Sequence, residues 1–220
     1  MNQQVIHVYL MPGMAANPSI FDNISLPESQ FELHKLHWMI PLQNETLSEY
    51  ALRMTKNITH TNVVLLGVSF GGILVQEMSK HIKLQKLIVV SSVKTKHELP
   101  KRMKVLKATK AYKLLPTQLL GNIDLLAKYA FGDTITKRVE LYKKYLSVND
   151  KAYLDWAIEQ VINWEQDEVI PEAIHIHGEK DGVFPHYCLG DCITVKGGTH
   201  IMIINKYKWF NENLPKLILG

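Results

Sequence analysis

The chain has 220 residues, of which 46% are hydrophobic, enough to form one domain with a substantial core. Its 25 basic and 21 acidic residues leave a net charge of +4, too weak an excess to indicate nucleic-acid binding. Cys188 and Cys192 match neither a disulfide framework nor a zinc site. There is no signal-peptide pattern and no run of about 18 apolar residues, so we expect a cytoplasmic protein without an integral membrane segment.

Short apolar runs alternate with helical patterns along the first 92 residues. The predicted strands are residues 5–10, 31–38, 62–66 and 84–92. Between them we expect a helical turn at 19–23, a helix that a capping box opens at Thr46 and that runs to about Ile58, and a helix from Phe70 to about Lys80. This alternation is typical of βαβ crossovers in a parallel sheet.

The alternation stops between residues 93 and 165, where the pattern is helical. Four helices fit, at 100–115, 117–130, 134–146 and 151–164, and we expect a helical insertion rather than a separate domain. The stretch 94–113 carries eight basic residues against one acidic residue. Such a run is typical of a solvated helix face, and the alternative is a site for an anionic substrate group or a membrane surface.

Two further strands are predicted at 173–177 and 192–195, followed by a closing helix at about 201–213. The whole chain, 1–220, is therefore predicted to be a single α/β domain. Its sheet should be mostly parallel and have about six strands, with helices on both faces and the four-helix insertion at about 93–165.

A nucleophile-elbow pattern, G-x-S-x-G, occupies residues 67–71, between the third strand and the helix that follows it. A turn this tight strains the backbone of Ser69 and presents its hydroxyl above the sheet. The N-terminus of the following helix points at the same place and favours negative charge there. The alternative is a glycine-rich turn without chemistry.

Asp181 and His200 fall in the loops that follow the last two strands, at the same edge of the sheet as Ser69. An imidazole can accept the serine proton near neutral pH, and a carboxylate orients the imidazole and stabilises its charged form. We therefore expect Ser69 as nucleophile, His200 as base and Asp181 as acid, with Asp191 as the alternative acid.

Three motifs together resemble the α/β-hydrolases over nearly the full chain: the elbow, H-G-x-x-D-x-x-x-P at 177–185 and G-G-x-H at 197–200. The resemblance implies an oxyanion hole formed by the backbone N–H groups of Phe70 and Met14. The loop before Met14 has Pro12 where family members commonly have histidine. The resemblance also implies that the first hairpin of the family's sheet is absent and that the helical insertion is a lid.

The leading hypothesis is a carboxylesterase-like serine hydrolase (EC 3.1.1) that cleaves an ester or thioester through an acyl-enzyme. The same triad supports C–C bond hydrolysis, lyase chemistry or acyl transfer, and a ligand-binding or signalling protein with slow turnover is a further alternative. We expect a small-molecule ester or thioester as partner, no nucleic acid, no cofactor and no metal. His175 and His177 lack the carboxylate pattern that would complete a metal site.

Overall fold

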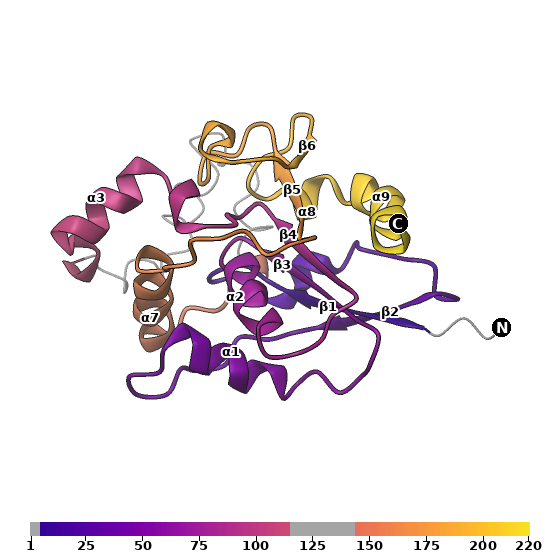
Figure 1. Ribbon diagram of the computed structural model, residues 1–220, viewed down its shortest axis with the longest axis horizontal. Helices are drawn as coiled ribbons and strands as arrows, with labels where there is room; N and C mark the ends of the chain where they lie inside the picture. Colours follow the sequence, from indigo (N-terminus) through magenta and orange to yellow (C-terminus); the bar gives the residue numbers. More distant parts are fainter. Residues whose placement is uncertain (1–4, 115–143) are drawn as a thin grey trace.

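The computed structural model describes residues 5–114 and 144–220, and in these residues one sheet carries helices on both faces (Figure 1). The strands are β1 (Ile6–Met11), β2 (Phe31–Lys35), β3 (Val63–Val68), β4 (Lys86–Val90), β5 (Ile174–Gly178) and β6 (Ile193–Val195). The α-helices are α1 (Leu47–Thr55), α2 (Phe70–Ser79), α3 (Lys101–Thr109), α7 (Lys151–Ile162), α8 (Met202–Asn205) and α9 (Tyr207–Leu219). Short 3-10 helices are η1 (Pro18–Phe21), η2 (Lys96–Glu98), η3 (Ala111–Leu114) and η5 (His186–Cys188).

The sheet has the strand order β2-β1-β3-β4-β5-β6, and every pairing in it is parallel. Strand β3 is buried along its whole length, as expected of an apolar run covered on both faces. The pairing between β4 and β5 is short. Ile88, Val89 and Val90 pair with residues 174–176, whereas five residue pairs join β3 to β4. The predicted six-stranded α/β sheet is confirmed.

Alternate side chains of the strands point into two separate hydrophobic layers. Tyr9 and Met11 of β1 pack in the layer that holds α1, α2 and α7. Val8 and Leu10 pack in the layer that holds η1, α8 and α9. The crossovers therefore cover both faces, and the carboxyl ends of the strands are left for loops.

The predicted capping box at the start of α1 is confirmed. The Thr46 hydroxyl accepts a hydrogen bond from the backbone N–H of Glu49, and the Glu49 carboxylate accepts one from the N–H of Thr46 at 2.9 Å. Two N–H groups that the helix cannot satisfy internally thus gain partners. The helix ends at Thr55, three residues before the expected end at Ile58.

Other predicted boundaries are also wrong, and β4 is shorter at both ends than the strand expected at 84–92. Strand β2 ends at Lys35, and Trp38 leaves the sheet to donate a hydrogen bond from Nε1 to the carbonyl of Gly13 at 2.9 Å. The closing helix is broken at Lys206 into α8 and α9, and α9 continues through Pro215 to the end of the chain. A proline inside a helix removes one backbone donor, and burial of neighbouring apolar residues in the second layer offsets that loss.

The expected insertion is described only in part. Its first helix corresponds to α3 followed by η3, and its last helix to α7, and these lie beside one another (Figure 1). The helix expected at 117–130, and nearly all of the one expected at 134–146, lie outside the described residues, so the four-helix lid stays a prediction. Among the described helices, none has the length and apolar character needed to cross a bilayer.

Candidate active site

Ser69 lies between β3 and α2 with a backbone φ of 55° and ψ of −122°, a conformation that is strained for any residue other than glycine. The turn is tight enough that a Cβ on Gly67 would lie 2.2 Å from the carbonyl oxygen of Gly71. A Cβ on Gly71 would lie 2.3 Å from the carbonyl oxygen of Pro12, in the loop after β1. Glycines at both positions therefore allow the strand, the helix and the neighbouring loop to approach Ser69.

The replacement Gly71→Ala should destabilise the protein by about 3 kcal/mol or more, because the added methyl group meets backbone atoms that cannot rotate away. The measurement is the free energy of unfolding in urea. Gly182→Ala is the matched control, since a Cβ there meets no atom within 4 Å, and its stability should change by about 0.5 kcal/mol or less. Equal stabilities of the two variants would contradict the crowding at the elbow.

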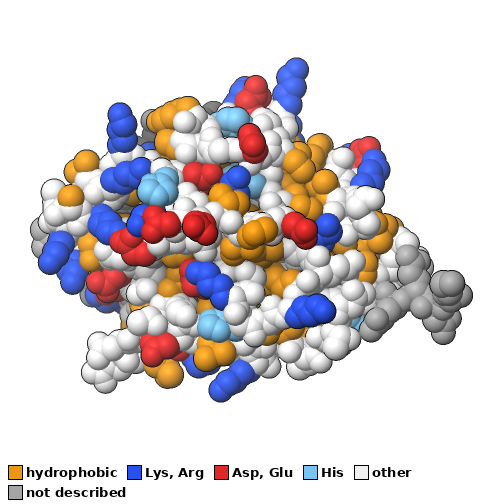
Figure 2. All heavy atoms as spheres, in the orientation of Figure 1, with side chains coloured by type: hydrophobic (Ala, Val, Ile, Leu, Met, Phe, Trp, Pro, Cys, Tyr) orange, Lys and Arg blue, Asp and Glu red, His pale blue; other side chains and the backbone are white. Residues whose placement is uncertain are grey.

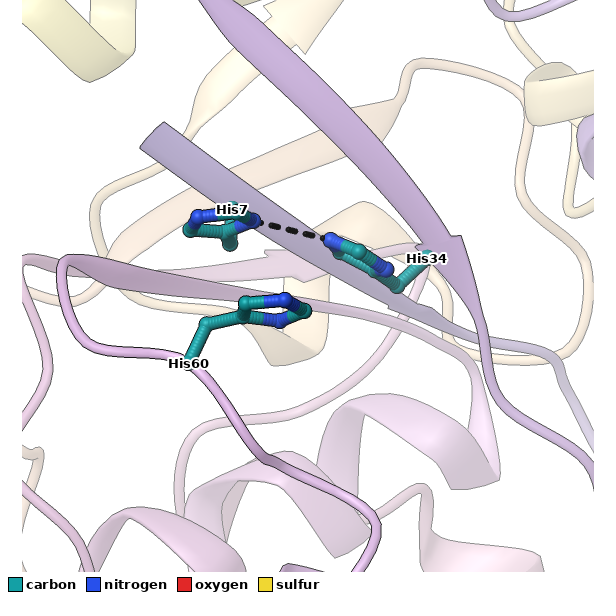
Figure 3. A group of neighbouring side chains, drawn as sticks. All are labelled: His7, His34 and His60. Atoms are coloured by element: carbon teal, nitrogen blue, oxygen red, sulfur yellow. Dashed lines mark hydrogen bonds between the residues drawn. The ribbon is translucent and has the colours of Figure 1, made fainter. Parts of the chain in front are cut away.

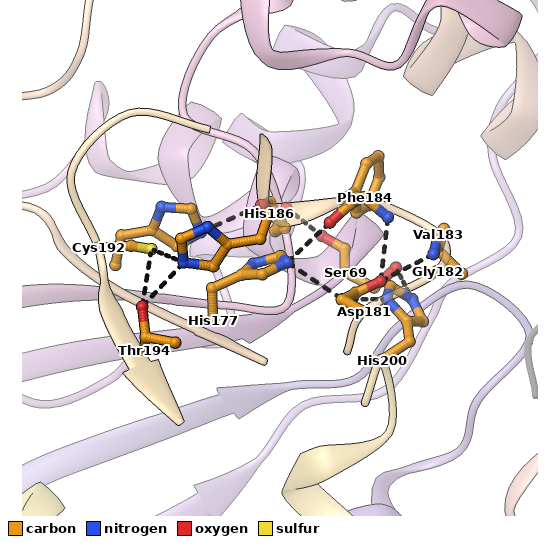
Figure 4. A network of polar contacts seen from close by, with 12 residues as sticks. Ser69, His177, Asp181, Gly182, Val183, Phe184, His186, Cys192, Thr194 and His200 are labelled. Atoms are coloured by element: carbon orange, nitrogen blue, oxygen red, sulfur yellow. Dashed lines mark hydrogen bonds and ion pairs between the residues drawn. The ribbon is translucent and has the colours of Figure 1, made fainter. Parts of the chain in front are cut away.

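The side chains of Ser69, His200 and Asp181 form a continuous chain of hydrogen bonds (Figure 4). Ser69 Oγ lies 3.0 Å from Nε2 of His200, and Nδ1 of His200 lies 2.9 Å from Oδ2 of Asp181. An ionised carboxylate can only accept, so Nδ1 of His200 carries the hydrogen and Nε2 is free to accept the proton of Ser69. The arrangement can thus remove a proton from the serine hydroxyl.

The carboxylate of Asp181 is buried and held by several donors. Its Oδ1 accepts hydrogen bonds from the backbone N–H groups of Val183, at 2.8 Å, and Phe184, at 3.0 Å. Nε2 of His177 lies 3.3 Å from Oδ2. Burial acts to raise the pKa of Asp181, but the charge and hydrogen bond of His200, helped by His177 and the Phe184 N–H, outweigh it and lower the pKa below its usual value. Asp181 is therefore ionised at neutral pH.

Solved structures with a similar fold were found at low sequence identity. The enol-lactonase from Burkholderia xenovorans LB400 is 13% identical with a TM-score of 0.72, over 99% of this chain and 92% of the other. An esterase from Exiguobacterium antarcticum is 17% identical with a TM-score of 0.71, over 99% and 93%. A bromoperoxidase from Bacillus anthracis is 16% identical with a TM-score of 0.68, over 100% and 94%. The chain has the α/β-hydrolase fold. No protein-family model matches the sequence, and no significant match was found among curated proteins.

In this α/β-hydrolase fold, the loop after β1 lies directly against the elbow. A Cβ on Gly13 would be 3.3 Å from the Cβ of Ser69, and Trp38 fixes the loop through its hydrogen bond to the Gly13 carbonyl. Within the described part of the chain, neither the N–H of Met14 nor that of Phe70 donates a hydrogen bond to another residue. Both groups named in the sequence analysis as oxyanion donors thus have no acceptor among the described residues.

The two candidate acids differ in their contacts. His200 forms its hydrogen bond with Asp181, whereas Asp191 contacts Lys94, whose Nζ donates to the Asp191 carbonyl at 2.8 Å. The contacts therefore favour Asp181 over Asp191 as the partner of His200 in this α/β-hydrolase fold.

Arg102 of α3 supports the loop that carries Asp181, a contact that the sequence analysis did not anticipate. Its guanidinium donates hydrogen bonds to the carbonyls of Gly182, at 2.9 Å, and Val183, at 2.6 Å. The sequence places Arg102 only within a basic run, and nothing in that run distinguishes it from the neighbouring lysines. The contact joins the start of the insertion to the loop after β5 that carries Asp181.

Part of the basic stretch 94–113 is paired with acidic side chains. Lys96 pairs with Glu165 at 3.1 Å and with Asp167 at 2.8 Å, and Lys107 also pairs with Glu165. Figure 2 shows basic and acidic side chains interspersed over this face of the molecule. These pairs favour the interpretation of a solvated helix face over that of a site for an anionic partner.

His175 connects β5 to the chain that follows β4. Its Nε2 lies 3.1 Å from the carbonyl oxygen of Ser92, and the Ser92 hydroxyl donates to the carbonyl of Ser69 at 2.7 Å. Burial, helped by the nearby charges of His177 and Lys94, lowers the pKa of His175 to about 3. The ring is therefore neutral in the folded protein and acts as a hydrogen-bond donor.

The buried His175 should make the protein less stable in mild acid. In the unfolded chain the ring titrates near 6.5, so below that pH the unfolded state binds a proton that the folded state excludes. The free energy of unfolding should fall by about 2 kcal/mol between about pH 7 and about pH 5 through this residue, and His177 acts in the same direction. Urea unfolding at both pH values measures this. His175→Gln keeps a donor for the Ser92 carbonyl, and its free energy of unfolding should fall less between the two pH values than that of the wild type. An equal fall would show that His175 is not the source of the pH dependence.

Proposed function

We propose that the protein is a serine hydrolase that cleaves a carboxylic ester or thioester through an acyl-enzyme. The observation that carries this proposal is the chain of two hydrogen bonds that joins Ser69 to His200 and His200 to the buried carboxylate of Asp181. A serine hydroxyl needs a positioned base to act as a nucleophile, and an imidazole oriented by a carboxylate is such a base.

In the first half of the proposed reaction, Nε2 of His200 accepts the proton of Ser69 while Oγ attacks the carbonyl carbon of the substrate. The carbonyl oxygen becomes negative, and the N–H groups of Phe70 and Met14 are proposed to stabilise it. The protonated His200 then gives its proton to the leaving alcohol or thiol as the bond to the carbonyl carbon breaks. Asp181 stabilises the imidazolium throughout.

In the second half, His200 takes a proton from water, and the hydroxide formed attacks the acyl group on Ser69. The same N–H groups hold the second tetrahedral intermediate. Its collapse returns the proton to Oγ of Ser69 and releases the carboxylic acid. The N-terminus of α2 lies at Phe70, so the helix dipole also favours the negative charge of both intermediates.

The test is labelling of the purified protein with a fluorophosphonate, followed by mass spectrometry of the intact protein and of its peptides. The proposal predicts one phosphonyl adduct on Ser69 in the wild type and none in His200→Ala. Hydrolysis of p-nitrophenyl esters of increasing acyl length, and of the matching thioesters, then identifies the preferred substrate class. A folded wild-type protein that neither reacts with the probe nor hydrolyses any ester would contradict the proposal.

A further inference from the structure

Three histidines lie together (Figure 3). His7 is near the amino end of β1 and His60 precedes β3, whereas Ser69 follows the carboxyl end of β3. His7 belongs to β1, His34 belongs to β2, and His60 lies in the segment between α1 and β3. One ring nitrogen from each residue lies within 4.8 Å of those of the other two. None of these histidines takes part in the proposed hydrolysis, so their grouping needs a separate explanation.

The nitrogens of His7 and His34 are already close to the spacing of a metal site. Nδ1 of His7 lies 3.0 Å from Nε2 of His34, and the two rings share one hydrogen between these atoms. In a tetrahedral zinc site, ligand nitrogens about 2.0 Å from the metal are about 3.3 Å from each other. A metal that replaces the shared hydrogen therefore requires these nitrogens to separate by a few tenths of an ångström and both rings to rotate until their lone pairs point at the ion, while that hydrogen moves to the other nitrogen of its ring.

The ring of His60 covers the other two. It stacks on His7 with a centroid separation of 3.8 Å and an angle of 6° between the planes, and its centroid lies 4.7 Å from that of His34. The Tyr9 hydroxyl lies 2.7 Å from Nδ1 of His60 and orients the ring. A metal lies in the plane of each imidazole that it binds, so His60 must tilt out of the stack. Its side chain is exposed and its segment is irregular, so no helix or strand opposes that tilt, which gives up the stacking on His7.

Glu32 supplies a negative charge and a possible fourth ligand at the same place. Its Oε2 lies 3.4 Å from Nδ1 of His7, and its Oε1 lies 3.8 Å from Nε2 of His34. Glu32 and His34 are two residues apart in β2, so both side chains point to the same face of the sheet. A cleft of about 510 Å³, lined in part by Tyr9, His34 and His60, gives an ion access to the cluster.

We propose that His7, His34 and His60 bind one divalent transition-metal ion of the class that prefers imidazole, such as Zn²⁺ or Cu²⁺, with Glu32 or water as the fourth ligand. The bound ion would join β1, β2 and the segment that leads into β3, and would stabilise this edge of the sheet because it binds only the folded chain. The ligands are far apart in the sequence and follow no metal-binding motif, which explains why the sequence analysis expected no metal.

The test uses the full-length protein without a histidine tag, titrated with ZnCl₂ in competition with a chromophoric chelator. We expect one ion per chain and a rise in melting temperature on saturation. His60→Ala should weaken binding by about tenfold or more and abolish the rise. His81→Ala removes another exposed histidine and should leave both unchanged. Substitution with Co²⁺ should give the visible absorption bands of a tetrahedral site in the wild type and lose them in His60→Ala.

Two results would overturn the proposal. The first is that His60→Ala and a second variant, His34→Gln, both bind Zn²⁺ as tightly as the wild type, since each should weaken binding. The second is binding that survives in His60→Ala and is lost in His200→Ala, because the ion would then occupy the proposed catalytic site. Hydrolysis of a p-nitrophenyl ester at one equivalent of Zn²⁺ should be unchanged, since the cluster lies away from Ser69.

Discussion

Replacement of Ser69 by alanine is expected to lower kcat/KM for a p-nitrophenyl ester by about three to six powers of ten. The replacement removes the oxygen that forms the acyl-enzyme and leaves His200, 3.0 Å from that oxygen, with no nucleophile to activate. The fold should be retained, because alanine removes only the hydroxyl and keeps the Cβ that the turn already accommodates. The measurement is steady-state hydrolysis together with a urea unfolding curve.

Two further variants make this prediction specific. His200→Ala should lose a similar factor, and the double variant with Ser69→Ala should lose no more than either alone, since the residues act as a unit. Ser79→Ala is a matched control at the other end of α2, where the hydroxyl donates to the carbonyl of Gln76, and it should keep wild-type activity. A Ser69→Ala protein that retained a tenth or more of the wild-type activity would exclude the acyl-enzyme mechanism.

The variant Asp181→Asn is expected to lower kcat by about 10⁴-fold with little change in KM. The asparagine oxygen can still accept hydrogen bonds from the N–H groups of Val183 and Phe184. Its amide group then faces His200 and donates to Nδ1, which moves the ring hydrogen to Nε2. In that tautomer Nε2 cannot accept the proton of Ser69. The measurement is kcat and KM on the ester that the wild type hydrolyses best.

Asp191→Asn is the matched control for the acid. Asp191 contacts Lys94 through its backbone carbonyl, which the replacement keeps, so activity should stay close to that of the wild type. If Asp191→Asn lost activity and Asp181→Asn kept it, the acid would be wrongly assigned.

The parts of the fold that could be predicted are those set by local patterns. The apolar run before Ser69 became the fully buried strand β3, and the alternation of strands and helices gave the parallel sheet. The loops carrying Asp181 and His200 follow β5 and β6, so topology alone indicated that these residues would approach Ser69. Their order along the chain was a further, motif-based indication.

The parts that could not be predicted depend on contacts between distant segments. The support that Arg102 gives to the Asp181 loop joins residues 80 apart, and a basic residue in a basic run carries no sign of it. The grouping of His7, His34 and His60 depends on the register of β1 and β2, which the sequence pattern leaves open. The end of β2 was misplaced because alternation continues to Trp38, although the hydrogen bond of that side chain to Gly13 draws it out of the sheet.

The short pairing between β4 and β5 separates the proposed catalytic residues into two groups. Ser69 belongs to the part built on β1 to β4, and Asp181 and His200 belong to the part built on β5 and β6. Within the sheet, three residue pairs join these parts, and side-chain contacts such as those of His175 with Ser92 and of Arg102 with the Asp181 loop connect them outside it. Cleavage of the chain between α3 and α7 would therefore place the proposed nucleophile on one fragment and the proposed base on the other. Ester hydrolysis by the mixed fragments would then show whether they reassemble.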